Sequence, residues 1–232
     1  MRKPSISFFC PAYNDEKNLA ILIPKVFKIL KKLCSGFEIV IVEDGSPDNT
    51  GKVADELATA YKPFIKVIHH RKNLGYGAAL RSGFSNAKKF DYVFYTDGDM
   101  QYDVEELSKM IPYLKDCEVV IGFRLKRTLT FIRQVQSIVF NWIIRLLFDL
   151  HIKDVNCAFK IVSRDALNKI NLTSNGAFID TELLVKLKKQ GYEFKEIEVV
   201  HLPRKFGKAS GGSIKVIFGT LFEMFKFYLN NK

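Results

Sequence analysis

Short apolar runs alternate with longer amphipathic segments along the first half of the chain. The runs are rich in Val, Ile and Phe, which is typical of strands buried on both faces of a parallel sheet. Strands are predicted over 6–10, 38–42, 65–69, 92–95 and 118–121. Helices are predicted over 17–33, 49–61, 77–89 and 104–115, with the first interrupted or restarted at Pro24. This β-α-β-α succession predicts an α/β fold that binds ligands at the carboxyl ends of its strands.

Polar, turn-forming residues follow four of the predicted strands, where such a sheet places its ligands. Each turn offers carboxylate, amide or basic side chains, so the candidate chemistry gathers at one edge of the predicted sheet. The four turns are 11–15 (PAYND), 43–46 (EDGS), 70–75 (HRKNLG) and 96–99 (TDGD).

The turn after the fourth strand holds two carboxylates separated by one glycine, Asp97-Gly98-Asp99, with Gln101 just beyond. Oxygen ligands of this kind suit Mg²⁺ or Mn²⁺, and Gly98 allows a tight turn that brings both carboxylates to one ion. Such an ion would bridge the phosphates of a nucleoside diphosphate and stabilise the departing charge. A solvated turn is the alternative, but the position after a buried strand favours a metal site.

The turn after the second strand contains Asp44, which is placed to accept hydrogen bonds from a base edge or a ribose. Asp44 or Ser46 can also cap the next helix, and the two roles are compatible. The glycines of 73–77 (NLGYG) permit close approach of the backbone to a ligand. Their spacing is neither GxGxxG nor a P-loop, which argues against a dinucleotide or ATP site.

Composition restricts the partners and the compartment. The 232 residues suit one sizeable α/β domain, and the formal charge of +11 implies an anionic partner such as a phosphorylated substrate, an acidic membrane or nucleic acid. No nucleic-acid-binding motif accompanies the charge, so we expect no nucleic-acid partner. Four scattered cysteines, no run of about 18 apolar residues and an early first strand predict a reduced, peripheral protein at the cytoplasmic face of a membrane, without a cleaved leader.

Two strongly apolar helices are predicted in the second half, over about 130–150 and 214–229. A stripe of polar residues spaced by four runs along the first, among many aromatic and aliphatic side chains. A buried core helix is one interpretation, but the abundant aromatic residues and flanking arginines favour an amphipathic helix at a membrane interface. The second helix carries three charged residues and is short for a membrane span, so we expect an amphipathic surface anchor at 213–232.

Four segments occur in the order seen in family-2 glycosyltransferases of the GT-A fold: 11–19 (PAYNDEKNL), 42–50 (VEDGSPDNT), 73–84 (NLGYGAALRSGF) and 96–107 (TDGDMQYDVEEL). They most resemble the branch that contains dolichol-phosphate mannose synthase and bacterial polyprenyl-phosphate glycosyltransferases. The resemblance implies a Rossmann-like, mixed but mainly parallel sheet in a domain over 1–212. Its nucleotide-sugar half would span about 1–123 and its acceptor half about 124–212.

The resemblance also implies roles for individual residues of the donor site. The one departure is Asp15, where the family usually has glutamate. By this resemblance the nucleoside is contacted by Pro11, Tyr13, Asp15 and Asp44, while the diphosphate and a Mg²⁺ or Mn²⁺ ion are bound by Asp97, Asp99 and Gln101.

The acceptor half resembles the family more thinly. Arg124 and Arg133 correspond to arginines that bind the acceptor phosphate, and the basic loop with Arg204 and Lys208 resembles one that closes over the donor and acceptor phosphates. The segment 154–160 keeps the family's aspartate, phenylalanine and basic residue, here Lys160. Its 156–158 (NCA) departs from the usual Thr-Ser-Gly.

The resulting prediction is an inverting, metal-dependent hexosyltransferase that uses GDP- or UDP-linked mannose or glucose and a polyprenyl or dolichyl phosphate. Such an acceptor is already anionic and needs no strong base. A sugar-hydroxyl acceptor is the alternative and requires a general base, for which Asp154, Asp180 or Glu182 is the candidate. A non-catalytic, nucleotide-binding membrane scaffold is a third possibility, which the intact metal motif disfavours. The residues predicted to be catalytic are Asp97, Asp99, Arg124, Arg133 and Arg204.

Overall fold

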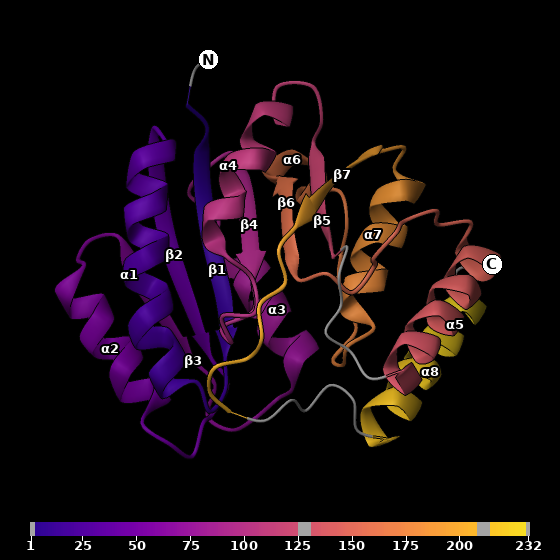
Figure 1. Cartoon of the computed structure of the whole chain (residues 1–232), viewed down its shortest axis with the longest axis horizontal. Helices are drawn as coiled ribbons and strands as arrows, with labels where there is room; N and C mark the ends of the chain where they lie inside the picture. The colour runs from indigo at the N-terminus through magenta and orange to yellow at the C-terminus, as the bar shows by residue number, and fades with distance from the viewer. Residues whose placement is uncertain (1–2, 125–130, 208–213, 231–232) are drawn as a thin grey trace.

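A mixed sheet flanked by helices organises the chain (Figure 1). The structure is a computed structural model that describes residues 3–124, 131–207 and 214–230, without the side chains of 131–137 and 214–215. The strand order within these residues is β3-β2-β1-β4-β6-β5-β7. The strands are β1 (Ser5–Ala12), β2 (Gly36–Glu43), β3 (Ile65–His69), β4 (Tyr92–Thr96), β5 (Val119–Arg124), β6 (Phe159–Ser163) and β7 (Phe194–Val199).

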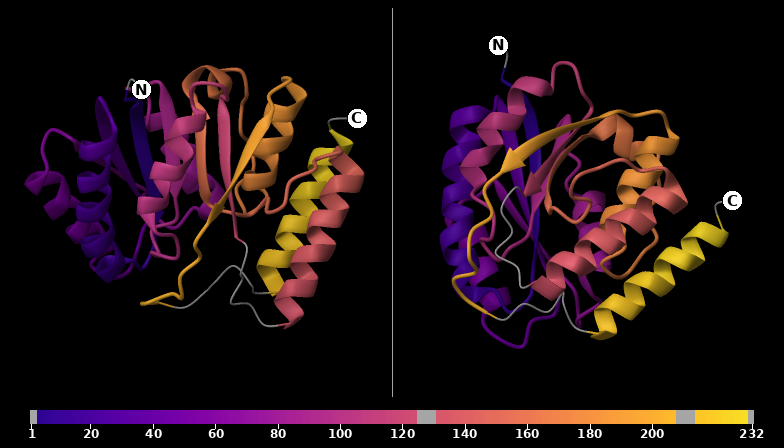
Figure 2. Two further views of the ribbon diagram at one scale, coloured as in Figure 1. Left: turned by 45° about the horizontal axis from the view of Figure 1, so that its top comes forward. Right: turned by 45° about the vertical axis from the view of Figure 1, so that its right-hand side comes forward.

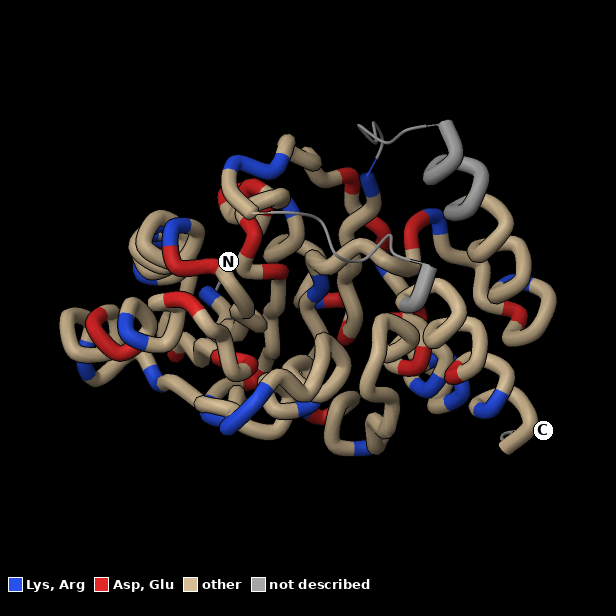
Figure 3. Tube along the Cα trace, turned by 90° about the horizontal axis from the view of Figure 1, so that it is seen from below, with Lys and Arg blue, Asp and Glu red and all other residues tan. Residues whose placement is uncertain are grey.

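The first four strands are parallel, as their continuous apolar runs predict. The prediction of a mixed, mainly parallel sheet is confirmed, because β6 alone runs antiparallel between β4 and β5, while β7 pairs parallel to β5. The carboxyl ends of β1, β2 and β4 therefore share one edge, which points downward in Figure 1. Figure 3 looks at the molecule from that side and shows acidic and basic residues interspersed.

Helices cover both faces of the sheet. In Figures 1 and 2, α1 and α4 lie on one face, whereas α3 and α7 lie on the other. The helices are α1 (Glu16–Leu33), α2 (Thr50–Ala60), α3 (Tyr76–Asn86), α4 (Leu107–Met110), α5 (Phe131–Phe148), α6 (Arg164–Asn168), α7 (Ile179–Lys189) and α8 (Ile214–Leu229).

Two of the predicted helices differ from the structure. Helix α1 continues through Pro24, because Ala20, whose carbonyl loses its usual donor there, is exposed and water can replace the missing N–H. The helix predicted over 104–115 is instead a short α4 between two 3₁₀ turns, Val104–Glu106 and Ile111–Tyr113. Pro112 at the start of the second turn accounts for the break, since it supplies no backbone donor.

Aromatic packing on both faces of the sheet fixes the strands that carry the candidate site. On the α3 face, the rings of Phe9 and Tyr95 stack with their centroids 5.3 Å apart, and Phe84 packs edge-on against both. On the other face, Phe94 packs against Phe159 at 4.8 Å. These contacts join β1, β4 and β6 through buried rings and hold the strand ends in a rigid frame.

Helices α5 and α8 lie side by side outside the sheet (Figures 1 and 2). Phe148 at the end of α5 packs 5.7 Å from Phe227 near the end of α8, measured between ring centroids. Large apolar side chains on these helices remain exposed: Ile138, Val139, Trp142 and Leu146 on α5, and Phe218, Phe222, Phe225 and Leu229 on α8. We call this surface the α5–α8 face.

Candidate active site

The turns after β1 and β4 touch at the carboxyl edge of the sheet. A Cβ atom at Gly98 would lie 2.6 Å from the carbonyl oxygen of Pro11 and 3.5 Å from Asp15 Oδ2. Only glycine fits at this contact, which is a second reason for Gly98 beside the tight turn predicted from sequence. Asn14 and Met100, in the same two turns, adopt positive φ values of 57° and 60°. The predicted residues Pro11, Asp15 and Asp97–Asp99 thus come together.

The carboxylates of the β4 turn lie in a crowded acidic environment. Tyr76 donates to Asp97 Oδ1 at 3.0 Å, and the backbone N–H of Gln101 donates to Asp99 Oδ1 at 3.0 Å. The pKa of Asp97 is raised well above its usual range, first by burial and then by the negative charges of Asp99 and Asp180. A cation at this position would relieve that repulsion.

The oxygen ligands offered by Asp97, Asp99 and Gln101 fit a divalent ion that also binds substrate. The described residues contain no group of three or more His, Cys, Asp or Glu side chains arranged to hold a metal. Two carboxylates and the Gln101 amide oxygen supply only part of a coordination shell. Mg²⁺ is typically held in this way, by one or two carboxylates together with substrate phosphates and water. The site therefore suits an ion that arrives with a nucleoside diphosphate.

Among the described basic residues, Arg204 is hydrogen-bonded to this turn. It follows β7, and its Nη2 donates to Asp99 Oδ2 and, at 3.3 Å, to the side-chain oxygen of Gln101. The strands bring this contact together across more than a hundred residues, since Tyr102 and His201 form a β-bridge beside it. The structure thus joins the predicted Arg204 to the predicted metal ligands.

Asp44 has a different environment. It is buried and accepts hydrogen bonds from the backbone N–H groups of Leu74 at 2.9 Å and Gly75 at 3.0 Å. His70 Nδ1 lies 2.6 Å from the same carboxylate. Asp44 therefore braces the loop before α3. The predicted capping of α2 is wrong for both Asp44 and Ser46, because Asn49 is the N-cap residue of α2. About one of the four lone-pair positions of Asp44 stays free, and its contact with a nucleoside stays a prediction.

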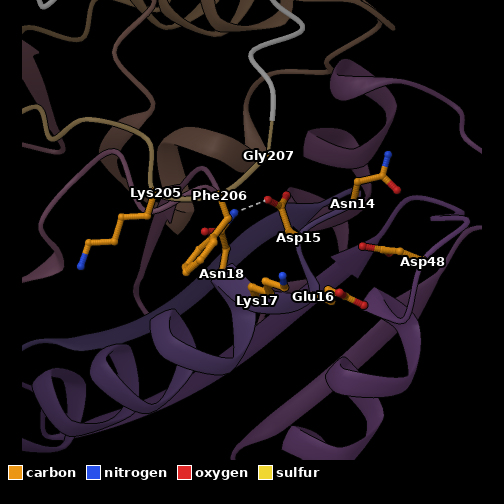
Figure 4. A pocket seen from close by; sticks show the side chains of 9 residues that line it. All are labelled: Asn14, Asp15, Glu16, Lys17, Asn18, Asp48, Lys205, Phe206 and Gly207. Carbon is orange, nitrogen blue, oxygen red and sulfur yellow. Dashed lines mark hydrogen bonds between the residues drawn. The ribbon is translucent and has the colours of Figure 1, made fainter.

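A pocket of about 420 Å³ opens beside residues predicted to bind the nucleotide-sugar donor, between the start of α1 and the segment after β7 (Figure 4). Asp15 lies on its wall, where it accepts from Asn18 Nδ2 at 2.7 Å. Burial raises the pKa of Asp15, although the Asn18 hydrogen bond opposes the shift. The exposed ring of Tyr13 lies in the adjacent turn. The pocket is lined by Asn14, Asp15, Glu16, Lys17, Asn18, Asp48, Lys205, Phe206 and Gly207.

Besides Arg204, the structure describes one more predicted acceptor arginine fully. Arg124, at the end of β5, donates from Nε and Nη2 to the two oxygens of Asp154 at 2.6 and 2.9 Å. This bidentate pair fixes the plane of the guanidinium group and leaves other N–H groups for a ligand. The side chain of Arg133 and all of Lys208 lie outside the described residues, so their predicted roles remain predictions.

Sequence reasoning gave no role to a buried network behind Asp97. Tyr76, predicted only as part of a ligand-binding loop, also lies 3.3 Å from Asp180 Oδ2. Asp180 Oδ1 accepts from Lys160 Nζ and from the Tyr95 hydroxyl, each at 2.5 Å. Sequence analysis singles out two of its members separately, Lys160 as the family's basic residue and Asp180 as a candidate base, but does not link them.

Comparison with known proteins identifies the family. The profile of glycosyl transferase family 2 matches residues 7–170, which include both aspartate turns and β6. The chain belongs to glycosyl transferase family 2. The family resemblance predicted from the four sequence segments is thereby confirmed.

Two relatives of this family-2 glycosyltransferase are named for lipid-phosphate substrates. Polyprenol monophosphomannose synthase of Mycolicibacterium smegmatis is 30% identical over 218 residues, which cover 88% of this chain and 81% of the relative. Undecaprenyl-phosphate 4-deoxy-4-formamido-L-arabinose transferase of Pectobacterium atrosepticum is 26% identical over 215 residues, covering 92% of this chain and 64% of the relative.

A solved structure supports the fold of the family-2 chain. Glucosyl-3-phosphoglycerate synthase from Mycobacterium tuberculosis, crystallised with Mn²⁺, uridine diphosphate and phosphoglyceric acid, gives a TM-score of 0.72 at 17% identity. The match covers 95% of this chain and 78% of the synthase. The GT-A-like architecture predicted from sequence is confirmed, while the division into donor and acceptor halves stays a prediction.

Proposed function

We propose that this family-2 glycosyltransferase transfers a hexose from a nucleoside-diphosphate sugar to a polyprenyl phosphate at a membrane surface. One observation carries the choice of acceptor. The three carboxylates that could serve as a general base for a sugar hydroxyl are all buried, and each is bonded to a cationic side chain. The pairs are Asp154 with Arg124, Asp180 with Lys160, and Glu182 with Lys186. The site is therefore better suited to an acceptor that is already negatively charged.

The proposed reaction needs no base from the protein. A phosphate monoester has a second pKa of about 6, so the acceptor is largely dianionic at neutral pH. Its oxygen attacks the anomeric carbon, and the bond from that carbon to the nucleoside diphosphate breaks with inversion. Arg124, Arg133 and Arg204 are proposed to orient the acceptor and to balance phosphate charge. The names of the two relatives support a lipid phosphate.

Asp97, Asp99 and Gln101 are the proposed ligands of a Mg²⁺ or Mn²⁺ ion. When bound, such an ion would supply Lewis-acid stabilisation of the departing diphosphate. The pocket beside Asp15 lies next to these ligands and supports placement of the nucleoside there. Mannose or glucose carried on GDP or UDP is the proposed donor.

The α5–α8 face supports work at a membrane. No helix in the described ranges is both long and apolar enough to cross a bilayer. Trp142 and Phe222 are 62% and 72% exposed, and exposed patches of large apolar side chains mark sites of interaction with proteins or membranes. The described parts of both helices are mainly uncharged in Figure 3. We propose that they lie in the lipid headgroup region on the cytoplasmic side, as amphipathic interfacial helices do.

Transfer of labelled sugar from a panel of nucleotide sugars to a short-chain polyprenyl phosphate tests the reaction. Mn²⁺- or Mg²⁺-dependent formation of a glycolipid, abolished by EDTA, is expected, and the productive donor names the sugar and the base. Consumption of a donor only in the presence of a sugar acceptor would indicate that the acceptor is a sugar hydroxyl and not a lipid phosphate. Absence of any donor turnover would favour the non-catalytic scaffold.

Membrane binding has its own test. Flotation with vesicles containing phosphatidylglycerol is expected to recover the wild-type protein, and the double variant Trp142→Ser/Phe222→Ser is expected to lose most of that binding. Ile21→Ser is the matched control, since Ile21 is an exposed apolar residue on α1, away from the α5–α8 face. Equal loss in the control would contradict the assignment.

A further inference from the structure

A fully buried lysine lies behind the proposed metal ligands. Lys160 is the second residue of β6, and its Nζ donates to the carbonyl of Cys157 at 2.6 Å and to Asp180 Oδ1 at 2.5 Å. Lysine is almost never fully buried unless it is paired. Lys160 is fully buried, and among the described residues Asp180 is the carboxylate with which it forms an ion pair.

Asp180 connects this lysine to the active-site turn. It lies near the start of α7 and receives the Tyr95 hydroxyl at 2.5 Å and the Tyr76 hydroxyl at 3.3 Å, in addition to Lys160. The Tyr76 hydroxyl lies 3.0 Å from Asp97 Oδ1. Tyr76 is thus the one described side chain whose hydroxyl lies within hydrogen-bond distance of both Asp97 and Asp180, so the two carboxylates share its single O–H.

Tyr76 is itself held firmly in place. It follows Gly75, whose φ is 93° and whose N–H is bonded to Asp44. The next residue, Gly77, donates its N–H to the carbonyl of Asn175 at 2.8 Å, and a Cβ there would lie 2.5 Å from the Asn175 backbone. The backbone on both sides of Tyr76 is therefore fixed, and its hydroxyl has little freedom to leave the two carboxylates.

We propose that Tyr76, Asp180 and Lys160 are positioning residues for the metal-bound diphosphate. Lys160 anchors Asp180, Asp180 and Asp97 share the single O–H of Tyr76, and this shared hydrogen holds the Asp97 carboxylate in the orientation in which it binds the ion. The inference rests on the metal-dependent donor binding proposed above. It deepens that proposal by assigning the geometry of Asp97 to residues that touch neither ion nor substrate.

A buried ion pair alone is weak evidence for a functional role, because well-packed apolar residues often stabilise a core equally well. The position of this pair argues for more than stability. Its carboxylate is within hydrogen-bond reach of the same hydroxyl that contacts Asp97, and the supporting partners of metal ligands typically affect metal affinity by about 10- to 100-fold.

Tyr76→Phe is the decisive variant, and Tyr95→Phe is its matched control. Each removes one hydroxyl that donates to Asp180, but only Tyr76 also reaches Asp97. Free Mn²⁺ is measured by electron paramagnetic resonance during titration of each protein in saturating GDP, and again in UDP. Tyr76→Phe is expected to weaken Mn²⁺ binding by about tenfold or more, and Tyr95→Phe by less than about twofold.

Steady-state kinetics provide a second readout. Tyr76→Phe is expected to raise the KM for the donor more than it lowers kcat, because the hydroxyl acts on binding geometry and not on the reacting atoms. Equal Mn²⁺ affinity in the wild type and Tyr76→Phe would overturn the inference, even if the wild type forms glycolipid. Absence of Mn²⁺ binding by the wild type with either nucleotide would overturn it together with the proposed metal dependence, which distinguishes the two failures.

The lysine–aspartate pair is tested without leaving a buried charge unpaired. Lys160→Met/Asp180→Asn removes both charges at nearly constant volume, whereas either single change leaves one charged partner in the core. The double variant is expected to fold, as shown by a cooperative thermal transition, and to lose Mn²⁺ affinity as Tyr76→Phe does. Wild-type Mn²⁺ affinity in a folded double variant would exclude Lys160 and Asp180 from the role.

Discussion

The turns after β2 and β4 each place an aspartate at the same edge of the sheet, yet the two carboxylates have opposite surroundings. Asp44 after β2 accepts two backbone N–H groups and contacts His70. Asp97 after β4 has one hydroxyl donor and the nearby negative charges of Asp99 and Asp180, and its pKa is raised by burial and by those charges.

The difference separates a carboxylate that builds the site from one that is kept for a ligand. A carboxylate largely satisfied by its own chain stabilises the fold and orders a loop. A carboxylate crowded by like charges costs stability until a cation arrives. The same residue type after the same kind of strand therefore serves two purposes, and the surroundings decide which.

Asp97→Asn provides the largest expected contrast. Transfer of the hexose is expected to fall about 100- to 1,000-fold, the effect of removing one preorganised electrostatic group from a transition state. The free energy of unfolding of the metal-free protein is expected to hold or rise, because one like charge leaves the cluster. Rates at saturating donor and urea unfolding measure the two effects, and loss of both activity and stability would contradict the comparison.

Asp44→Ala is expected to show the reverse pattern. It leaves the N–H groups of Leu74 and Gly75 without their charged acceptor in a part-buried position, at a cost of about 1–3 kcal/mol in the free energy of unfolding. Asp55→Ala is the control, because the exposed carboxylate of Asp55 pairs with His69 on the surface and its loss should cost less than about 1 kcal/mol. Similar values for both variants in urea unfolding would remove the distinction.

Both turns could be predicted from sequence because each is local. A buried run followed at once by Glu43-Asp44-Gly45 or Asp97-Gly98-Asp99 states the strand, its end and its chemistry within ten residues. The bounds predicted for β3 and α8, 65–69 and 214–229, agree with the structure for the same reason, since their apolar patterns end abruptly.

The features that could not be predicted from sequence depend on contacts between segments that are far apart in the chain. Strand β6 has five residues, the second of which is a lysine, and was not predicted, because its identity as a strand comes from pairing with β4 and β5. Tyr76 links Asp97 to Asp180, although Asp97 lies 21 positions and Asp180 lies 104 positions away from it in the sequence. No local pattern reports such a link, nor the different surroundings of Asp44 and Asp97.

Replacement of Gly45 by alanine tests how tightly the turn after β2 packs against the backbone of Lys72. Gly45 has a φ of 66°, and a Cβ there would lie 2.3 Å from the backbone of Lys72. Gly191 has a φ of 85° with nothing within 4 Å of the same position. Gly191→Ala is expected to cost about 1 kcal/mol from backbone strain alone, and Gly45→Ala about 1 kcal/mol more. Equal costs in urea unfolding would mean that the loop moves aside freely.

The smallest expected effect concerns the sign of a pH dependence. Burial alone would raise the pKa of Glu43, but the Ser46 backbone N–H, 2.5 Å from Glu43 Oε1, and His69 outweigh it and lower the pKa below its ordinary 4.5. A lowered folded-state pKa gives stability that is present above pH 4.5 and lost as the pH falls through the folded value. Glu43→Gln should therefore cost about 1 kcal/mol near pH 7 and progressively less in acid.

Asp97 should give the opposite slope. Its folded-state pKa is raised, so the metal-free protein loses stability as the pH climbs from 3.8 toward the folded value, and Asp97→Asn removes that loss. Unfolding free energies of the wild type and both variants, measured by urea from acid to neutral pH without divalent ions, decide the question. Changes of slope in the same direction would mean that both carboxylates have one kind of environment. Opposite changes would show that ionised Glu43 stabilises the end of β2. They would also show that ionised Asp97 destabilises the β4 turn, at a cost that only a cation relieves.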